Sequence, residues 1–114
     1  MKIINQRGKE LNKREIYKMT KDKGLIMMKD VEDNTLIDVV ASIEFIDEKD
    51  ENETTIYGIM DKDGTCYAFQ SKTFNDSLND ILDIMEDEAD ESVGIIKISG
   101  KTKAGRDYIN CKLA

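Results

Sequence analysis

Residues 35–46, Thr-Leu-Ile-Asp-Val-Val-Ala-Ser-Ile-Glu-Phe-Ile, decide the predicted fold. They are rich in β-branched side chains and partly alternate between apolar and polar residues, which predicts one long strand. A charged loop is expected over residues 47–53, followed by shorter strands over 54–60 and 65–70. The turn between these two, Asp61-Lys62-Asp63-Gly64, ends in a glycine that can adopt the positive φ of a tight hairpin connection.

A helix is predicted after Ser71, because the apolar period changes there. The apolar residues fall at i, i+4, i+7, i+8 and i+11 and form one stripe, made of Phe74, Leu78, Ile81, Leu82 and Met85. Thr73 and Asp76 resemble a capping box at the helix start. Two strands, over residues 92–99 and 106–113, are expected to follow. Residues 9–21 favour a short helix whose thin apolar stripe predicts weak docking.

The order of these elements indicates a mainly β protein. Three strands, a helix and a final hairpin are the order of an OB-fold, a five-stranded Greek-key barrel with one helix between its third and fourth strands. A short N-terminal helix precedes it. The same elements are also compatible with an α+β sandwich. A long first strand favours the barrel, because such a strand can pair with both halves of a closed sheet. The predicted division is a basic N-terminal arm, residues 1–29, and an OB-fold domain, residues 30–114.

Charge is sorted by position along the chain. Residues 1–29 carry nine lysine and arginine residues against three acids, residues 30–96 carry three against twenty, and residues 97–114 carry five against one. Partners respond to local fields, so a chain with a net charge of −7 can still hold a polyanion in a basic groove. No stretch is apolar enough for a membrane helix, and the N-terminus lacks the features of a signal peptide, so a cytoplasmic protein is expected.

The residues available for chemistry argue against an enzyme. The chain has no histidine, which removes the commonest general base and metal ligand. Its two cysteines, Cys66 and Cys111, have no second ligand at zinc spacing, and both fall in apolar strand patterns that favour buried, reduced thiols over a redox role. We therefore expect no metal, no cofactor and no catalytic residue.

The final hairpin shows a division between two faces. Because side chains alternate along a strand, Tyr108, Asn110 and Lys112 share one face, while the residues between them face the core. Arg106, Lys103 and Lys101 follow through the turn. Single-stranded nucleic acid needs this mixture, since cations hold phosphates and aromatic faces stack bases. The third strand repeats the pattern, with Tyr67 between Lys62 and Lys72.

A family resemblance covers Thr35 to Leu113. The shared landmarks are the long strand from Thr35 ending in the aromatic Phe45, the acidic loop followed by Glu53-Thr54-Thr55-Ile56-Tyr57, the segment from Asp63-Gly64-Thr65-Cys66-Tyr67 to Thr73, and the closing segment from Ser99 to Gly105 with its strand. In order and spacing these motifs resemble the small single-stranded-DNA-binding proteins of tailed bacteriophages, particularly those of protein-primed phages.

The resemblance implies an OB-fold protein that coats single-stranded DNA during replication without strong sequence preference. It also implies that Phe45, late in the long strand, and Tyr67, just after the Asp-Gly turn, stack on bases. Phe45 stands where the family has tyrosine, and the acidic loop carries no aromatic residue here. Residues 1–29 lie outside the resemblance.

The predicted function is non-enzymatic binding of single-stranded DNA during phage DNA replication. If about three to five cations engage phosphates, the logarithm of the binding constant should fall with the logarithm of salt at a slope of roughly −2 to −3.5. The predicted contacts combine aromatic and cationic side chains: Phe45, Tyr57, Lys62, Tyr67, Lys72, Lys97, Lys101, Lys103, Arg106, Tyr108 and Lys112.

Three further expectations stay open at this point. An acidic phage protein could instead inhibit a host or defence protein by mimicking nucleic acid, as the acidic middle of the chain would allow. The OB-like domain could also only join proteins. Finally, the acidic run over residues 83–91 suggests self-association along the DNA, with the basic N-terminal arm of a neighbouring molecule as its partner. That hypothesis predicts that deletion of residues 1–21 abolishes cooperative clustering but spares the fold.

Overall fold

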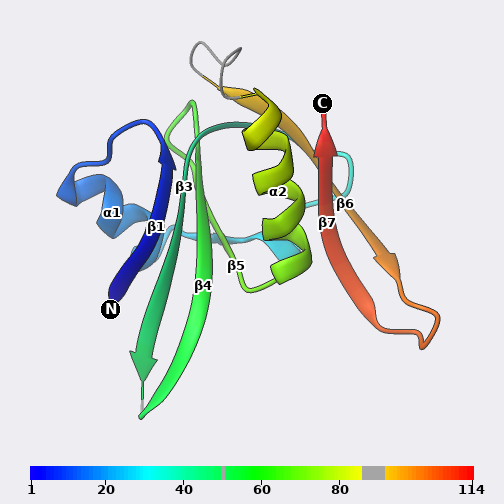
Figure 1. Cartoon of the computed structure of the whole chain (residues 1–114), viewed down its shortest axis with the longest axis horizontal. Helices are drawn as coiled ribbons and strands as arrows, with labels where there is room; N and C mark the ends of the chain where they lie inside the picture. The colour runs from blue at the N-terminus through cyan, green and yellow to red at the C-terminus, as the bar shows by residue number, and fades with distance from the viewer. Residues whose placement is uncertain (50, 86–91) are drawn as a thin grey trace.

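The computed structural model describes residues 1–49, 51–85 and 92–114 and is shown in Figure 1. These residues are mainly β, with a curled mixed sheet and two α-helices. In chain order the elements are β1 (Lys2–Gly8), α1 (Lys13–Thr20), β2 (Ile26–Met27), the short 3-10 helix η1 (Met28–Asp30), β3 (Leu36–Lys49), β4 (Asn52–Asp61), β5 (Cys66–Phe69), α2 (Lys72–Met85), β6 (Val93–Lys101) and β7 (Asp107–Leu113).

The long strand β3 organises the sheet, as its sequence predicted. From Val39 to Lys49, β3 pairs with β4 along one edge. The other edge is shared, because β6 pairs with Leu36–Val39 and β1 pairs with Ala41–Ile46. The register with β4 shifts between Val39 and Ala41, which marks a bulge. One strand thus joins two halves of the sheet.

Neighbouring strands follow the order β2-β5-β4-β3-β6-β7, with β1 attached to β3. The sheet curls so that the β6–β7 hairpin swings away from the β3–β4 hairpin, with α2 lying between the two halves (Figure 1). The described residues form seven strands, so the predicted count of five is wrong. The two additional strands are β1 and β2. Both are exposed along most or all of their length, and neither shows the alternation of apolar and polar residues that predicts a strand.

The bulge after Val39 places apolar residues of β3 on both faces of the sheet. Ile37 and Val39 belong to a core cluster with Phe69, Phe74 and Leu78, beneath α2. Beyond the bulge, Ala41, Ile43 and Phe45 belong to a second cluster, which contains Met19 of α1 and Met60 of β4. The sheet therefore has one core on each face, and each is covered by a different helix.

The N-terminal elements pack directly against this sheet. β1 pairs with β3, and Met19 of α1 is fully buried, so the expected weak docking of the helix is wrong. Gly58 of β4 allows the helix to come close, since a Cβ there would stand 3.2 Å from the carbonyl oxygen of Met19. The boundary at residue 29 stays a prediction. Deletion of residues 1–21 would nevertheless remove a strand and a core side chain, so it is unsuited to testing self-association without harm to the fold.

Two local predictions change in detail. The predicted loop over residues 47–53 is largely strand, because Asp47, Glu48 and Lys49 pair with Thr54, Glu53 and Asn52, and cross-strand pairing overrides the weak strand preference of the acids. The helix after Ser71 is confirmed, but Ser71 caps it: the Phe74 backbone N–H donates to the Ser71 hydroxyl oxygen at 3.1 Å, in place of a Thr73–Asp76 box.

The turn before β5 is confirmed, with Gly64 at φ 87°. The acidic run over residues 83–91 extends past Met85, and its residues 86–91 lie outside the described residues. Across the part of the chain that the structure describes, no helix is long and apolar enough to cross a membrane.

Candidate nucleic-acid interface

A cleft of about 890 Å³ opens between the β6–β7 hairpin and the chain near η1 and the start of α2. It lies where the described sheet is open, because β2 and β7 stand at opposite ends of the strand order and the described residues show no pairing between them. Its size falls within the range of sites that hold small organic ligands, about 300–1,000 Å³. Its lining combines cations, an aromatic ring and small polar side chains: Lys29, Asp30, Ser71, Lys97, Ser99, Gly100, Lys101, Asp107, Tyr108 and Ile109.

Tyr108 gives this cleft its aromatic surface. The residue is 40% exposed and pairs across the hairpin with Gly100. A Cβ built at Gly100 would lie 2.6 Å from the Tyr108 hydroxyl oxygen and 2.8 Å from Cζ, so the ring rests on the glycine backbone. The absence of a side chain at residue 100 thus allows the ring to lie at this position. One ring face is held by the protein, and the exposed part is available to stack on a base.

Lys97 is committed to an internal network. Its side chain is 4% exposed, and its Nζ donates to the Val31 carbonyl oxygen at 2.7 Å and to Asp33 Oδ1 at 3.1 Å. The Ser99 hydroxyl donates to the other Asp33 oxygen at 2.5 Å. The hydrogen bond from Ser99 and then that from Lys97 hold the pKa of Asp33 below its ordinary value. The predicted contact between Lys97 and phosphate therefore does not fit this position, since the ammonium group already has its partners.

The remaining cations around the cleft are exposed. Lys101 lies 3.7 Å from Asp107 in a pair that is open to solvent on both sides, and such pairs are weak. Lys103 and Arg106 are exposed at the hairpin turn, where the Thr102 backbone N–H donates to the Arg106 carbonyl oxygen. Lys29 is exposed on η1 and faces the hairpin from across the cleft. Sequence reasoning missed Lys29, because only the fold brings it beside Tyr108.

Tyr67 and Lys62 form a separate group outside this cleft. Tyr67 is half-buried against the core, and its hydroxyl lies 3.5 Å from Asp61 Oδ2. Burial, and then the nearby Asp61, raise the pKa of Tyr67. Lys62 pairs with Asp38 at 3.3 Å. The structure does not bring this group to the Tyr108 cleft, and both residues stay predicted contacts.

Two predicted stacking residues lie in the core. Phe45 is 1% exposed within the cluster that α1 covers, so its ring has no face available to a base in this structure. Tyr57 is 8% exposed and stacks on Phe69, with ring centroids 5.4 Å apart. Burial raises the pKa of Tyr57, which keeps its hydroxyl neutral. The sequence placed both in strands but did not show which sheet face a helix would cover.

The last two predicted cations are not among the residues that line the cleft. Lys72 pairs with Asp76 one helical turn later, at 2.8 Å, and Lys112 is exposed on β7. Both cysteines are free and buried, as predicted. Burial raises the pKa of Cys66 and raises that of Cys111 to about 12. Among the described residues, no three His, Cys, Asp or Glu side chains gather as a metal site.

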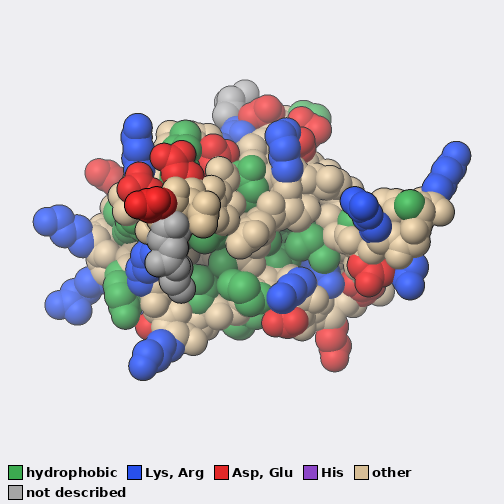
Figure 2. Space-filling view, turned by 90° about the horizontal axis from the view of Figure 1, so that it is seen from below, with side chains coloured by type: hydrophobic (Ala, Val, Ile, Leu, Met, Phe, Trp, Pro, Cys, Tyr) green, Lys and Arg blue, Asp and Glu red, His purple; other side chains and the backbone are tan. Residues whose placement is uncertain are grey.

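Lysine and arginine side chains lie at both sides of the face shown in Figure 2, over the N-terminal elements and over the β6–β7 hairpin, with acidic side chains among them and apolar surface between the two groups. The two groups are separated in sequence, and the fold presents them at opposite edges of one face of the molecule. This arrangement is available to an extended polyanion.

Comparison with known proteins identifies the family. Residues 11–114 match the family described as Phage Single-stranded DNA-binding protein, and the chain belongs to it. Comparison with curated proteins and with solved structures gave no match. The family match begins at residue 11 and therefore includes α1, which the resemblance seen in the sequence did not reach.

Proposed function

We propose that this member of the phage single-stranded DNA-binding family coats single-stranded DNA during phage DNA replication, without strong sequence preference and without an enzymatic step. The observation that carries this proposal is the Tyr108 cleft, in which an exposed ring stands together with the exposed cations Lys29 and Lys101 in a chain of this family. Such a protein would act in the cytoplasm of the replicating host cell.

The binding mechanism divides between the ring and the cations. A base stacks on the exposed part of Tyr108, and because every base has a π-face this contact tolerates any sequence. Lys101, Lys103 and Arg106 neutralise phosphates on the hairpin side, and Lys29 does so from across the cleft. Lys62, Tyr67, Lys72 and Lys112 are predicted contacts for parts of the strand beyond the cleft.

The strand order supports an OB-fold assignment. When β1 and β2 are set aside, five strands and one helix remain, in the sequence order β3, β4, β5, α2, β6, β7 and the spatial order β5-β4-β3-β6-β7. These orders are those expected of a five-stranded Greek-key barrel that is open between its third strand, β5, and its fifth strand, β7. The cleft lies at this opening. In this assignment β1 and β2 are additions to the barrel.

The experiment is a fluorescence-anisotropy titration of a labelled poly(dT) strand of about 30 nucleotides, at several salt concentrations, with a duplex of the same length as control. Four cations on phosphates would give a slope of about −2.8 in the logarithm of affinity against the logarithm of salt, at ~0.7 per contact for single strands. Preferential binding of the single strand with such a slope supports the proposal. Equal affinity for the duplex, a slope near zero, or no binding at low salt would overturn it, and the last result would direct attention to protein partners of the acidic surface.

A further inference from the structure

The exposed face of α1 carries an aromatic ring among cations and has no part in the Tyr108 cleft. Tyr17 is 54% exposed, the largest exposed fraction among the seven aromatic residues of the chain. Lys13, Arg14 and Lys18 are exposed on the same helix. This combination of side chains has the chemistry that single-stranded nucleic acid requires.

Helical spacing places these side chains together. Lys13 and Arg14 stand four and three residues before Tyr17, so their side chains neighbour its ring on the helix surface. Met19, which anchors the helix in the core, belongs to the opposite face. The ring and its flanking cations therefore point away from the sheet.

Three cations of this face form no ion pair among the described residues, although the charge of Lys18 acts on the nearby Glu15. Within residues 1–49, 51–85 and 92–114, Lys13, Arg14 and Lys18 take part in no ion pair, whereas Lys9 and Lys21 of the same region pair with Glu15 and Asp47. Arg14 and Lys18 are one turn apart, and like charges at this spacing destabilise a helix. A face that keeps such repulsion beside an exposed ring is suited to a polyanionic partner.

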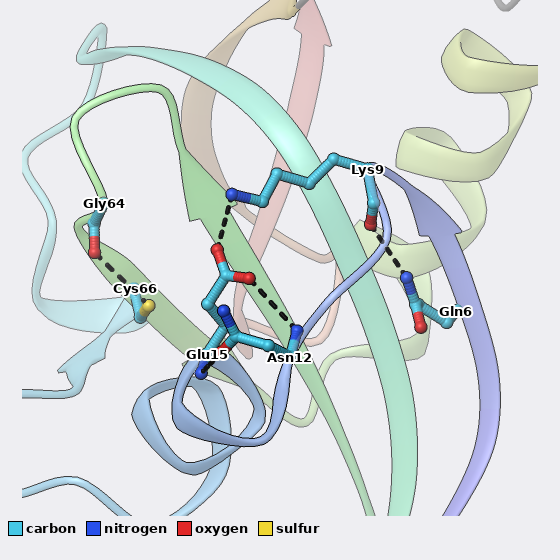
Figure 3. A network of polar contacts seen from close by, with 6 residues as sticks. All are labelled: Gln6, Lys9, Asn12, Glu15, Gly64 and Cys66. Carbon is cyan, nitrogen blue, oxygen red and sulfur yellow. Dashed lines mark hydrogen bonds and ion pairs between the residues drawn. The ribbon is translucent and has the colours of Figure 1, made fainter.

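Hydrogen bonds at the start of the helix support the orientation of the face. Asn12 and Glu15 form a capping box, with the Glu15 backbone N–H donating to Asn12 Oδ1 at 2.9 Å and the Asn12 backbone N–H donating to Glu15 Oε1 at 3.1 Å (Figure 3). Lys9 bonds the second oxygen of Glu15 at 2.5 Å. The bond from Lys9 and the capping bond lower the pKa of Glu15, so the box stays intact at neutral pH. A preorganised surface loses little freedom on binding.

We propose that the exposed face of α1 is a second contact for single-stranded DNA, reached by the same strand that occupies the Tyr108 cleft. The inference rests on the proposed function and extends it to a second subsite. Tyr17 stacks a base, and Lys13, Arg14 and Lys18 hold the adjacent phosphates. Because α1 and the β6–β7 hairpin lie on opposite sides of a molecule whose two longer dimensions are 39 and 38 Å, only a long strand can reach both (Figure 1).

The direct test uses the absence of tryptophan from the chain. Tyr17→Trp places a single reporter on the α1 face, and Ile84→Trp places a matched reporter on α2 at a position that is 79% exposed. On titration with poly(dT) of about 30 nucleotides, the tryptophan at residue 17 should be quenched through stacking, while the one at residue 84 should not. Quenching at neither site, with DNA binding intact, would overturn the inference and leave the proposed function standing.

Affinity measurements give a second, independent readout. Tyr17→Leu should weaken binding of the long strand between about 5-fold and 150-fold, the range expected for one stacked base, and should leave binding of a strand of about five nucleotides unchanged. Arg14→Gln with Lys18→Gln should reduce the salt slope by about 1.4. Thermal melts of each variant separate these effects from loss of fold.

Two other outcomes are distinguishable. Failure of the unmodified chain to bind any single strand would refute the proposed function itself. If the α1 variants bind one-site strands normally but lose cooperativity on long strands, the face contacts a neighbouring copy of the chain, which would overturn a DNA contact at α1.

Discussion

Substitution of Tyr108 should separate DNA binding from stability. The ring contacts Gly100 across the hairpin, and cross-strand contacts between two side chains contribute about 0.2–1 kcal/mol each to folding, which sets the scale for this contact. A base stacked on an aromatic side chain contributes about 1–3 kcal/mol to binding. Tyr108→Ala should therefore weaken binding of single-stranded DNA by about 5-fold to 150-fold while the free energy of unfolding changes by about 1 kcal/mol or less.

Gly100→Ala provides the matched variant, because it leaves the tyrosine in place. The added methyl group would stand 2.6 Å from the Tyr108 hydroxyl oxygen, so the ring must swing away from the position in which one face is supported. Since the ring is the movable partner, the fold should accommodate the methyl group while affinity falls. Tyr108→Phe keeps the ring and should lose less affinity than Tyr108→Ala.

Anisotropy titration with labelled poly(dT) and urea unfolding, both on the same preparations, measure the two free energies. The reasoning is refuted if Tyr108→Ala and Gly100→Ala bind as tightly as the unmodified chain. It is also refuted if affinity and stability fall together, since that result would make the ring a structural element rather than a stacking surface.

Three further predictions concern the groups beside the cleft and in the core. Lys97→Met should destabilise the fold by about 1.5–3 kcal/mol, because it removes charged hydrogen bonds from a buried position. Lys101→Gln should instead mainly reduce the salt slope of DNA binding. Urea unfolding and salt titrations of both variants measure these effects, and the same behaviour in the two variants would contradict the prediction. Because the pKa of Asp33 is lowered from its ordinary value of 3.8, its contribution to stability is present at neutral pH and is lost as the pH falls below 3.8 and through the lowered pKa. Asp33→Asn should therefore reduce the fall in unfolding free energy at acid pH. An unchanged fall would count against the network. Burial and the raised pKa of Cys111, about 12, predict that Cys111 and Cys66 resist alkylation at pH 8 in the folded protein and react once urea unfolds it; fast reaction of the native thiols would contradict their burial.

Local sequence patterns predicted the elements whose periodicity is strong. The long strand β3, the apolar stripe of α2 and the turn at Gly64 all depend on neighbours within a few residues, and all are present. β1 carries no such signal because it lies exposed at an edge and gains its structure from pairing with β3. Its existence depends on residues about 40 positions away, which no local pattern shows.

The candidate site was predictable only where strand alternation stays uninterrupted. Tyr108 and the hairpin cations are exposed as their alternation indicated. Phe45 lies beyond the bulge at Val39–Ala41, where odd-numbered residues of β3 turn to the face that α1 covers. Lys97 is drawn inward by Asp33, a residue 64 positions earlier. Long-range packing thus decided which of the predicted residues remain available to DNA.

The most direct test of the account is to map the bound strand on the protein by NMR. In a titration of the labelled protein with poly(dT), the amide signals should shift most at Ser99–Lys101, at Tyr108 and Ile109, and at Lys29 and Asp30, which line the cleft. Shifts concentrated there would support single-stranded DNA in the opening of the curled sheet. Binding that leaves these signals in place and shifts only residues of the β3–β4 hairpin would contradict it.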